Sequence, residues 1–416
     1  GYVSKAPEND VFEMKTSDGR TFTIKLGSNL EVKFLRNLGE DYKGCSDKLT
    51  ELLNIGQMLM VYGIFYPKNE EYLFEAKTIT FPDRNPTQYR FEEADWWIKQ
   101  ARQIADFYIK AQFGGPDDID YKRYRTSITL DGKLKDTTRQ ETDTISRLIF
   151  GLASTYLLTG EDIYLEAAEK GSKYLQDHMK FHDKQNDIVY WYHGIDVIDG
   201  KDHILLTSEF GDDYHAIPAY EQIYALAGLT QTYRATGDPA ILKDIQLTIN
   251  LFDKYYLDET KGGYFSHLDP KNLDPCEESL GQNRAKKNWN SVGDHAPAFL
   301  INLCLATGEK KYLEFLKNTA DTIHDHFQDY ENSPFVQEKF HEDWSHDKNW
   351  GWQQDRGVVG HNLKIAWNLM RINCKLPHPG YVEFAKKIAE LMPKTGMDIQ
   401  RFGWYDVMER KIFEGE

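Results

Sequence analysis

The sequence predicts a mainly α-helical protein, an α/α toroid of the (α/α)6-barrel type behind a small N-terminal β-barrel domain. Two observations support this prediction. Residues 1–88 consist of short β-prone runs separated by turn residues. From residue 89 onward the apolar residues follow a helical period, and one plan of two helices with a Thr-Gly joint recurs. The predicted domains are therefore an OB-like β domain at 1–88 and a toroid at 89–416.

The first domain has the element order of a five-stranded OB-like barrel. A hairpin is predicted by DVFEMKT, the turn SDGR and TFTIKL, and LEVKFL is a third strand. A capped helix at SDKLTELLNIG is followed by two further strands, QMLMVYGIFYP and EYLFEAKTITFP. The order β-β-β-α-β-β is that of an OB fold. The segment holds 11 basic and 13 acidic residues, so it favours packing or carbohydrate contact over phosphate binding.

The second domain repeats a helical hairpin, and an aromatic β-hairpin is predicted after each repeat. The joints are LLTGEDIYLEAA, RATGDPAILKDI and LATGEKKYLEFL, and a fourth unit after residue 360 has a different joint. In each of the three joints Gly can end one helix in the left-handed conformation, and an acidic residue or Pro opens the next. A ring of stacked hairpins is an α/α toroid, whose inner helices direct their N-terminal turns toward one cavity.

Equivalent positions early in each inner helix are expected to face that cavity. Counting 12 residues back from the Thr of each joint gives Arg147, Tyr224 and His295, and His361 stands near the same place in the fourth unit. Polar side chains at such positions cost stability unless they are paired or used. We expect a functional site there, and hydrogen-bonded core residues are the alternative.

Composition disfavours several classes of protein. The 50 Lys and Arg residues against 66 Asp and Glu residues give a net charge of −16, and nucleic acid binding needs a basic face. No apolar run reaches the roughly 18 residues of a transmembrane helix. The four cysteines have neither metal-ligand nor disulfide-framework spacing. We expect no metal, no cofactor, no nucleic acid or membrane partner and, without a signal-peptide pattern, a cytoplasmic location.

Aromatic residues make up 13% of the chain, and several tryptophans fall in loops expected to rim the cavity. These are Trp191, Trp289, Trp344 and Trp352. We expect them to bind substrate by stacking on sugar faces, and packing of the loops against the barrel is the alternative.

Two carboxylates offer a different chemistry. Asp213 and Glu221 lie in SEFGDDYHAIPAYEQ, and a pair of carboxylates across an α/α cavity can hydrolyse a glycosidic bond. Capping of the following helix by these acidic residues is the alternative.

Three segments of the helical domain resemble the N-acylglucosamine 2-epimerase family, which includes cellobiose 2-epimerases and aldose–ketose isomerases on an (α/α)6 barrel. They are FVQEKFHEDW with the following GHNLKIAWNLMRI, SVGDHAPAFLINLCLATGEKKYLEF, and QETDTISRLIFGLASTYLLTG. The resemblance covers about residues 90–410. It implies ring opening of a sugar, removal of the C2 proton by a histidine, and reprotonation of an enediolate.

The resemblance assigns roles to three of the counted residues. His361 is implied as a proton-transfer residue, His295 as its partner or as a ring-opening residue, and Arg147 as the contact of an oxyanion or hydroxyl. The alternative for Arg147 is an ion pair with Asp143, four residues earlier on the same helix face.

The sequence also departs from the family pattern. Family members have Glu three residues after each of the two histidines, where this chain has Ala298 and Lys364, and a lysine should lower the pKa of a neighbouring histidine. The family has a further catalytic histidine well beyond the second motif, whereas the sequence continues for 55 residues after His361. We expect an incomplete barrel that a second chain or segment completes. A five-hairpin or open toroid is the alternative.

The function predicted is a cofactor-free sugar 2-epimerase or aldose–ketose isomerase acting on a small sugar or oligosaccharide through His361, His295 and Arg147. An α/α-barrel glycoside hydrolase using Asp213 and Glu221 is the second reading. A non-catalytic carbohydrate-binding or assembly protein on the same fold is the third.

Overall fold

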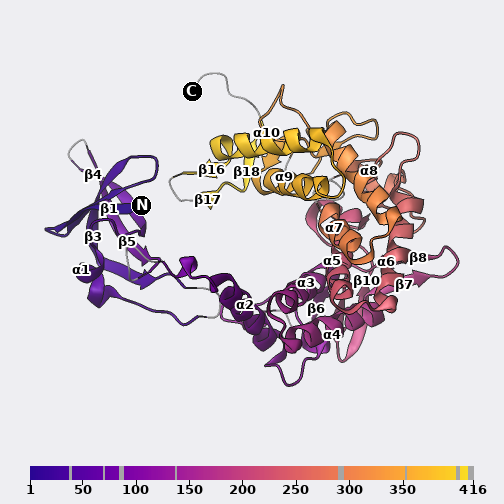
Figure 1. Cartoon of the computed structure of the whole chain (residues 1–416), viewed down its shortest axis with the longest axis horizontal. Helices are drawn as coiled ribbons and strands as arrows, with labels where there is room; N and C mark the ends of the chain where they lie inside the picture. Colours follow the sequence, from indigo (N-terminus) through magenta and orange to yellow (C-terminus); the bar gives the residue numbers. More distant parts are fainter. Residues whose placement is uncertain are drawn as a thin grey trace. The chain divides into compact units, whose positions relative to one another are not determined.

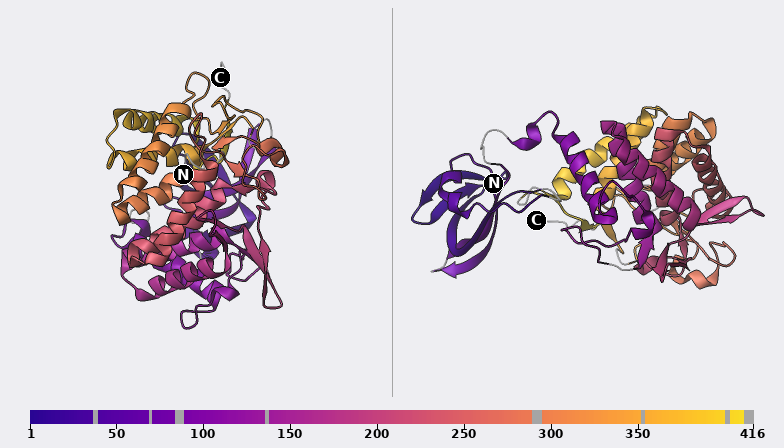
Figure 2. Two further views of the ribbon diagram at one scale, coloured as in Figure 1. Left: turned by 90° about the vertical axis from the view of Figure 1, so that its right-hand side faces the viewer. Right: turned by 90° about the horizontal axis from the view of Figure 1, so that it is seen from below.

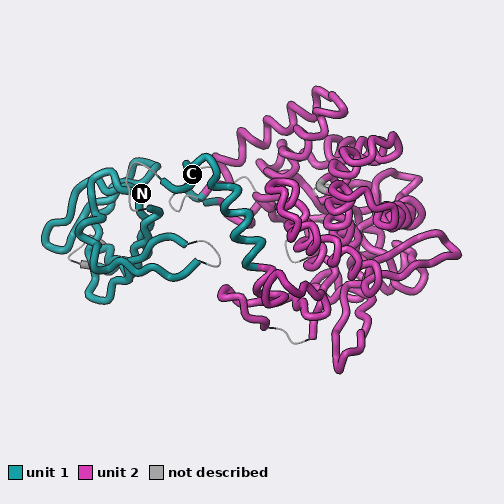
Figure 3. The backbone as a smooth tube through the Cα atoms, turned by 60° about the horizontal axis from the view of Figure 1, so that its bottom comes forward, with its two compact units in different colours: residues 1–107, 398–403 teal, residues 108–397, 404–416 magenta. Residues whose placement is uncertain are grey.

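The computed structural model describes residues 1–36, 40–68, 71–83, 89–135, 138–288, 295–351, 354–399 and 403–410. The chain divides into two compact units (Figure 3), residues 1–107 with 398–403 and residues 108–397 with 404–416. The predicted domain boundary after residue 88 borders the segment 84–88, which lies outside the described residues. That boundary stays a prediction.

The first unit contains a five-stranded sheet with the order β1-β2-β3-β5-β4. Neighbouring strands are antiparallel except β3 and β5, which run parallel. A short 3-10 turn and helix α1 lie between β3 and β4. The predicted helix and the two strands after it are confirmed. The predicted strands TFTIKL and LEVKFL are two parts of the single strand β3, and β1 was not predicted, so the first three strands differ from the prediction. The bounds are β1 (Tyr2–Glu8), β2 (Val11–Lys15), β3 (Thr21–Phe34), α1 (Leu49–Leu52), β4 (Met60–Lys68) and β5 (Glu71–Phe81).

The two edges of this sheet approach each other around one apolar core. The backbone N–H of Leu59, just before β4, donates to the carbonyl of Gly1 at 2.9 Å, and that of Val3 donates to the carbonyl of Gln57 at 3.0 Å. The interior is filled by side chains that are at most 1% exposed, among them Val3, Phe12, Ile24, Leu59, Ile79 and Phe81. Classification of this sheet as an OB-like domain stays a prediction.

The second unit is built from helical hairpins joined as predicted. Gly160, Gly237 and Gly308 end α3, α5 and α7 in the left-handed conformation, with φ of 73°, 70° and 66°. In the fourth hairpin Cys374 ends α9 in the right-handed region, as its different joint sequence indicated. Helix α2 (Trp96–Phe113) is divided between the two units after residue 107. The helices of the hairpins are α3 (Thr142–Thr159), α4 (Asp162–His178), α5 (Ala219–Thr236), α6 (Pro239–Leu251), α7 (Ala296–Thr307), α8 (Lys310–His326), α9 (Val359–Asn373) and α10 (Pro379–Thr395).

These helices form two layers of an α/α toroid (Figures 1 and 2). Helices α3, α5, α7 and α9 pack against one another in chain order, and each also packs against the helix that follows it. The closest approach joins α3 and α5. The Gly228 N–H donates to the Ser146 hydroxyl at 2.9 Å, and a Cβ at Gly228 would lie only 2.3 Å from the Ser146 carbonyl oxygen. Glycine at this position therefore lets the two inner helices touch.

Short strands connect the hairpins at the end where the inner helices begin. The first predicted aromatic hairpin forms two ladders, β7 with β8 and β9 with β10. The other two segments instead pair with distant residues, β12 with β11 and β14 with β13. In the first of them the Asp-, Asn- and Pro-rich sequence after β12 makes turns rather than a second strand. The bounds are β6 (Arg139–Glu141), β7 (Lys180–Asp183), β8 (Ile188–Trp191), β9 (Gly194–Ile198), β10 (Lys201–Leu205), β11 (Ile217–Pro218), β12 (His267–Leu268), β13 (Lys287–Asn288), β14 (Lys339–Phe340), β15 (Arg356–Val358), β16 (Met397–Asp398), β17 (Gly403–Trp404) and β18 (Val407–Glu409).

Within the described ranges the toroid has four helical hairpins, α3–α4, α5–α6, α7–α8 and α9–α10. A full (α/α)6 barrel has six helical hairpins. That a second chain or segment completes the barrel of this protein stays a prediction. None of the helices in the described part of the chain combines the length and hydropathy that a membrane span requires.

Candidate functional site

Six side chains from four inner helices meet at the N-terminal ends of those helices. We call this group the inner cluster, and it consists of Arg147, Tyr220, Tyr224, His295, His361 and Lys364. Arg147 comes from α3, the tyrosines from α5, His295 from the N-cap of α7, and His361 and Lys364 from α9. The three residues found by counting back from the helix joints, and His361 near the same place in the fourth unit, therefore lie together in the structure.

Arg147 connects the cluster to the tyrosines of α5. Its Nη2 atom donates to the Tyr220 hydroxyl at 2.6 Å, and its guanidinium carbon lies 4.1 Å from the centre of the Tyr224 ring. The predicted ion pair with Asp143 is also present at 3.4 Å. Arg147 thus has both of the environments that the sequence suggested, a place in the cluster and a carboxylate partner.

His295 is held by contacts from two helices. Its Nδ1 atom lies 2.6 Å from the Tyr224 hydroxyl and 2.6 Å from Nζ of Lys364. Its ring meets the ring of His361 edge to face, with centroids 5.4 Å apart and planes at 87°. Because His295 is only 7% exposed, these contacts fix its ring in one orientation.

His361 is oriented by a carboxylate that sequence reasoning missed. Nδ1 of His361 lies 2.9 Å from Oε1 of Glu338, which is 6% exposed. The Glu338 loop is tied to α9, because the Val336 N–H donates to Asn362 Oδ1 at 3.0 Å. The only sequence signal for Glu338 was its place in the FVQEKF motif. A histidine whose Nδ1–H is directed at a carboxylate presents Nε2 for proton transfer.

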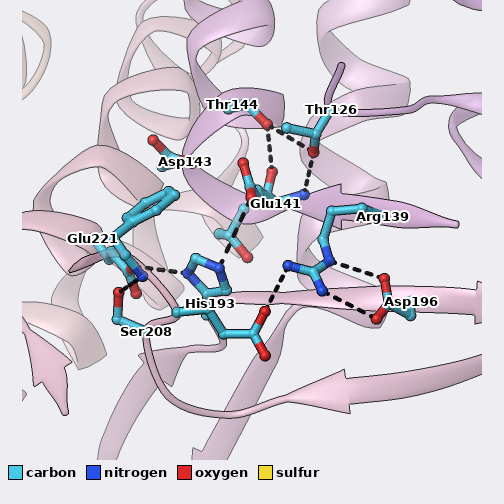
Figure 4. A network of polar contacts seen from close by, with 12 residues as sticks. Thr126, Arg139, Glu141, Asp143, Thr144, His193, Asp196, Ser208 and Glu221 are labelled. Carbon is cyan, nitrogen blue, oxygen red and sulfur yellow. Dashed lines mark hydrogen bonds and ion pairs between the residues drawn. The ribbon is translucent and has the colours of Figure 1, made fainter. Parts of the chain in front are cut away.

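A second group of polar residues lies beside the inner cluster, shown in Figure 4. We call it the acidic cluster, and it comprises Glu141, Asp143, His193 and Glu221. Nδ1 of His193 lies 2.8 Å from Oε1 of Glu221, and its Nε2 lies 3.9 Å from Oε1 of Glu141. Asp143 connects the two clusters through its ion pair with Arg147. His193 was not singled out from the sequence, since it lies in a strand-loop segment without a helical register.

The environment of the acidic cluster raises the pKa values of its carboxyl groups and of its histidine. Burial raises the pKa of Glu221 and of Asp143, although His193 and Arg147 respectively act in the opposite direction. For His193, burial acts to lower the pKa, but the hydrogen bond and charge of Glu221 outweigh it and the net direction is upward. Glu221 is therefore half of a histidine–carboxylate pair that shares a proton.

The two carboxylates predicted to act in a glycoside hydrolase, Asp213 and Glu221, contact different histidines. Asp213 Oδ1 lies 2.7 Å from Nε2 of the buried His267, whereas Glu221 contacts His193. The capping alternative for Asp213 is wrong, because α5 begins at Ala219 and its N-cap is Pro218. Asp213 lies earlier, in a 3-10 turn.

Of the four tryptophans, two lie in the described residues and both make protein contacts. Trp191 is 1% exposed, and its indole N–H donates to the Thr248 hydroxyl at 2.9 Å. Trp344 stacks on His326, with centroids 3.9 Å apart and planes at 2°. These contacts agree with loop packing, and Trp191 has no face exposed to a ligand. Trp289 and Trp352 lie outside the described residues.

Among the described side chains, no group of three or more His, Cys, Asp or Glu residues is arranged to hold a metal ion.

A toroid of helical hairpins with polar side chains gathered at the N-terminal ends of its inner helices defines the class of α/α-toroid proteins. The family model of N-acylglucosamine 2-epimerase (GlcNAc 2-epimerase) matches residues 123–412. The chain therefore belongs to the N-acylglucosamine 2-epimerase family, and the resemblance found in the sequence is confirmed.

Individual relatives agree with this assignment. The chain is 30% identical over 152 residues to a cellobiose 2-epimerase of Bacteroides fragilis, covering 36% of this chain and 30% of the relative. It is 25% identical over 287 residues to a D-mannose isomerase of Marinomonas mediterranea, covering 66% of this chain and 64% of the relative. The matched part is thus less than two thirds of the length of either relative.

A solved structure shows the same fold. The crystal structure of a D-mannose isomerase superposes with a TM-score of 0.61 at 17% identity, covering 77% of this chain and 76% of that one. This likeness confirms the predicted α/α toroid.

Proposed function

We propose that this protein is a sugar 2-epimerase or an aldose–ketose isomerase that works by proton transfer at C2. The observation that carries the proposal is the contact of 2.9 Å between Nδ1 of His361 and the buried carboxylate of Glu338. It gives an imidazole at the N-terminal end of an inner helix both a fixed tautomer and a partner that stabilises its protonated form.

In the proposed reaction His361 takes the C2 proton of the open-chain sugar through Nε2. The electrons of the C–H bond form a double bond between C1 and C2, and those of the carbonyl move to O1, giving an enediolate. Rotation about the C2–C3 bond turns the other face of the enediolate toward His361, and return of the proton to C2 then gives the epimer. Return of the proton to C1, with transfer of the O2–H proton to O1, gives the ketose. General base catalysis of this kind contributes about 10²- to 10⁴-fold to the rate.

Arg147 and the tyrosines of α5 supply the polar contacts that this reaction requires. The guanidinium group of Arg147 is partly exposed and already bound to the Tyr220 hydroxyl. A fixed cation and hydroxyl donors beside the reacting carbons stabilise the negative charge that develops on O1. A cationic and aromatic surface also suits a sugar, which offers hydroxyl groups and apolar C–H faces.

The family supports a sugar as the substrate, and its two relatives suggest which sugars to test first. One is named a cellobiose 2-epimerase and the other a D-mannose isomerase. We therefore propose an aldose, free or at the reducing end of a short oligosaccharide.

The test is proton NMR of cellobiose, D-mannose and D-glucose incubated with the full chain in D2O. We expect loss of the C2 proton signal as deuterium enters, together with the signals of an epimer or ketose. His361→Ala should abolish both changes. His203→Ala, which alters an exposed histidine on β10, should leave them unchanged.

Two results would contradict the proposal. Exchange at C2 that persists in His361→Ala would remove His361 from the reaction. Binding of these sugars without any exchange would instead support the non-catalytic carbohydrate-binding function.

A further inference from the structure

The two histidines of the inner cluster have partners of opposite charge. His361 contacts the carboxylate of Glu338, whereas Nζ of Lys364 lies 2.6 Å from Nδ1 of His295. Lys364 follows His361 by three residues on α9 and therefore lies on the same helix face. It stands where the family pattern noted in the sequence has Glu.

The chemistry of the ammonium group determines the tautomer of its partner. An ammonium group has three N–H donors and no acceptor, so its hydrogen bond to His295 requires that Nδ1 carry no proton. The Tyr224 hydroxyl, also 2.6 Å from Nδ1, can donate to the same atom. The ring proton of His295 is then on Nε2.

The cationic groups of the inner cluster oppose a second ring proton on His295. Helix α9 contributes Lys364 and His361, helix α5 contributes Tyr220 and Tyr224, and the guanidinium carbon of Arg147 of α3 lies 4.1 Å from the centre of the Tyr224 ring. Asp143 is paired with Arg147, and Glu338 is bonded to His361. A protonated His295 would place two positive charges at hydrogen-bond distance, which is unfavourable in a largely buried site.

We propose that Lys364 is a positioning residue that keeps His295 neutral with its proton on Nε2, while His361 acts as the base. This rests on the proposed function. The C2 proton passes to Nε2 of His361, and the neutral ring of His295, 5.4 Å from that of His361 between centroids, adds no positive charge beside the imidazolium that forms.

The test is 15N NMR of the histidine rings in the full chain, with the His295 signals assigned by their loss in His295→Gln. In the wild-type protein we expect the Nε2-protonated neutral form of His295 throughout pH 6–8. Lys364→Glu should move the ring proton to Nδ1 and raise the midpoint of His295 titration by about one pH unit or more. Lys364→Arg, which keeps the charge and the donors, should retain the wild-type tautomer. The control Lys386→Glu, an exposed position on α10, should have no effect.

The pH profile of kcat/KM gives a second test of the effect of Lys364 on His295. If C2 exchange is catalysed, Lys364→Glu should shift the acidic limb of the pH profile of kcat/KM to higher pH, and Lys364→Arg should restore it. A wild-type His295 that carries its proton on Nδ1 would overturn the inference even if exchange occurs. Absence of exchange together with the Nε2-protonated form would overturn the proposed function but not the effect of Lys364 on His295. If Lys364→Glu fails to fold, the wild-type and Lys364→Arg spectra still decide the tautomer.

Discussion

At the scale of single residues, partners rather than helical positions distinguish the two histidines of the inner cluster. Both lie near the start of an inner helix, but His361 contacts a carboxylate and His295 contacts an ammonium group. A carboxylate stabilises the imidazolium that a base becomes after it takes a proton, whereas an ammonium group destabilises it. The two side chains are therefore suited to different steps of one reaction.

The role of Glu338 can be tested by Glu338→Gln, which keeps the size and a hydrogen-bonding group but removes the charge. We expect kcat for C2 exchange to fall by about 10²-fold, with little change in KM, because Glu338 contacts His361 and not the sugar. Steady-state NMR assays give both constants. Glu331→Gln, at an exposed position earlier in the same loop, is the control, and an equal loss in both variants would contradict the assignment.

The histidine of the acidic cluster predicts a pH dependence of stability. The pKa of His193 is raised in the native state, so between its ordinary value near 6.5 and the raised native value the folded protein binds more protons than the unfolded one. The free energy of unfolding contributed by His193 therefore falls as pH rises through this window. His193→Gln should remove that contribution.

The measurement for His193 is urea unfolding of both proteins from pH 5.5 to 8.5, compared as a difference. The pKa values of His326 and His346 are lowered by burial and have the opposite effect on stability, but they are common to both proteins and cancel. The pKa values of Glu221 and Asp143 rise further in His193→Gln, because His193 lowers both. Since carboxyl groups ordinarily titrate near pH 4, the sign is read at the alkaline end, from pH 7 to 8.5. A difference between the two proteins that does not shrink as pH rises would contradict the expected sign.

At the scale of secondary-structure elements, the sequence predicted the helices and their register, which depend on local periodicity. It did not predict residues that distant contacts bring into the site. The Thr-Gly joints fixed the register of three inner helices, and counting from them found three members of the inner cluster, Arg147, Tyr224 and His295. Glu338 and His193 lie in loops and short strands, and the folding of distant segments brings them to their partners. The capping alternative for Asp213 was wrong for a different reason, because Pro218 was a local signal that the helix begins later, at Ala219.

The contact between α3 and α5 connects helix packing to the site. Gly228→Ala would place a Cβ 2.3 Å from the Ser146 carbonyl oxygen, so the helices must separate. We expect destabilisation of roughly 1–3 kcal/mol and slower C2 exchange, because Arg147 directly follows Ser146. Thermal unfolding and the NMR assay measure the two effects.

Gly151 provides the matched control for this substitution. It lies in the middle of α3, and a Cβ there would meet nothing within 4 Å. Gly151→Ala should therefore be neutral or stabilise the helix by up to about 1 kcal/mol. Equal destabilisation by both variants would show that helix propensity, and not the close approach of α3 and α5, explains the effect of Gly228→Ala.

At the scale of the whole molecule, the two units have separate hydrophobic cores. The β unit is built around residues such as Ile24 and Ile79, and the toroid around inner-helix residues such as Leu226 and Ile149, all of them fully buried. Units that do not share a core can unfold independently. Two thermal transitions are therefore expected for the full chain.

The prediction is tested by one large-to-small substitution in each core, followed by calorimetry. Ile79→Ala should destabilise the β unit by about 2–5 kcal/mol and lower the midpoint of one transition only. Leu226→Ala, on α5, should lower the other. Because the inner cluster belongs to the toroid, Ile79→Ala should leave C2 exchange unchanged below its own transition. A single transition that both variants lower equally would mean that the units fold as one, and that the β unit contributes to the stability of the site.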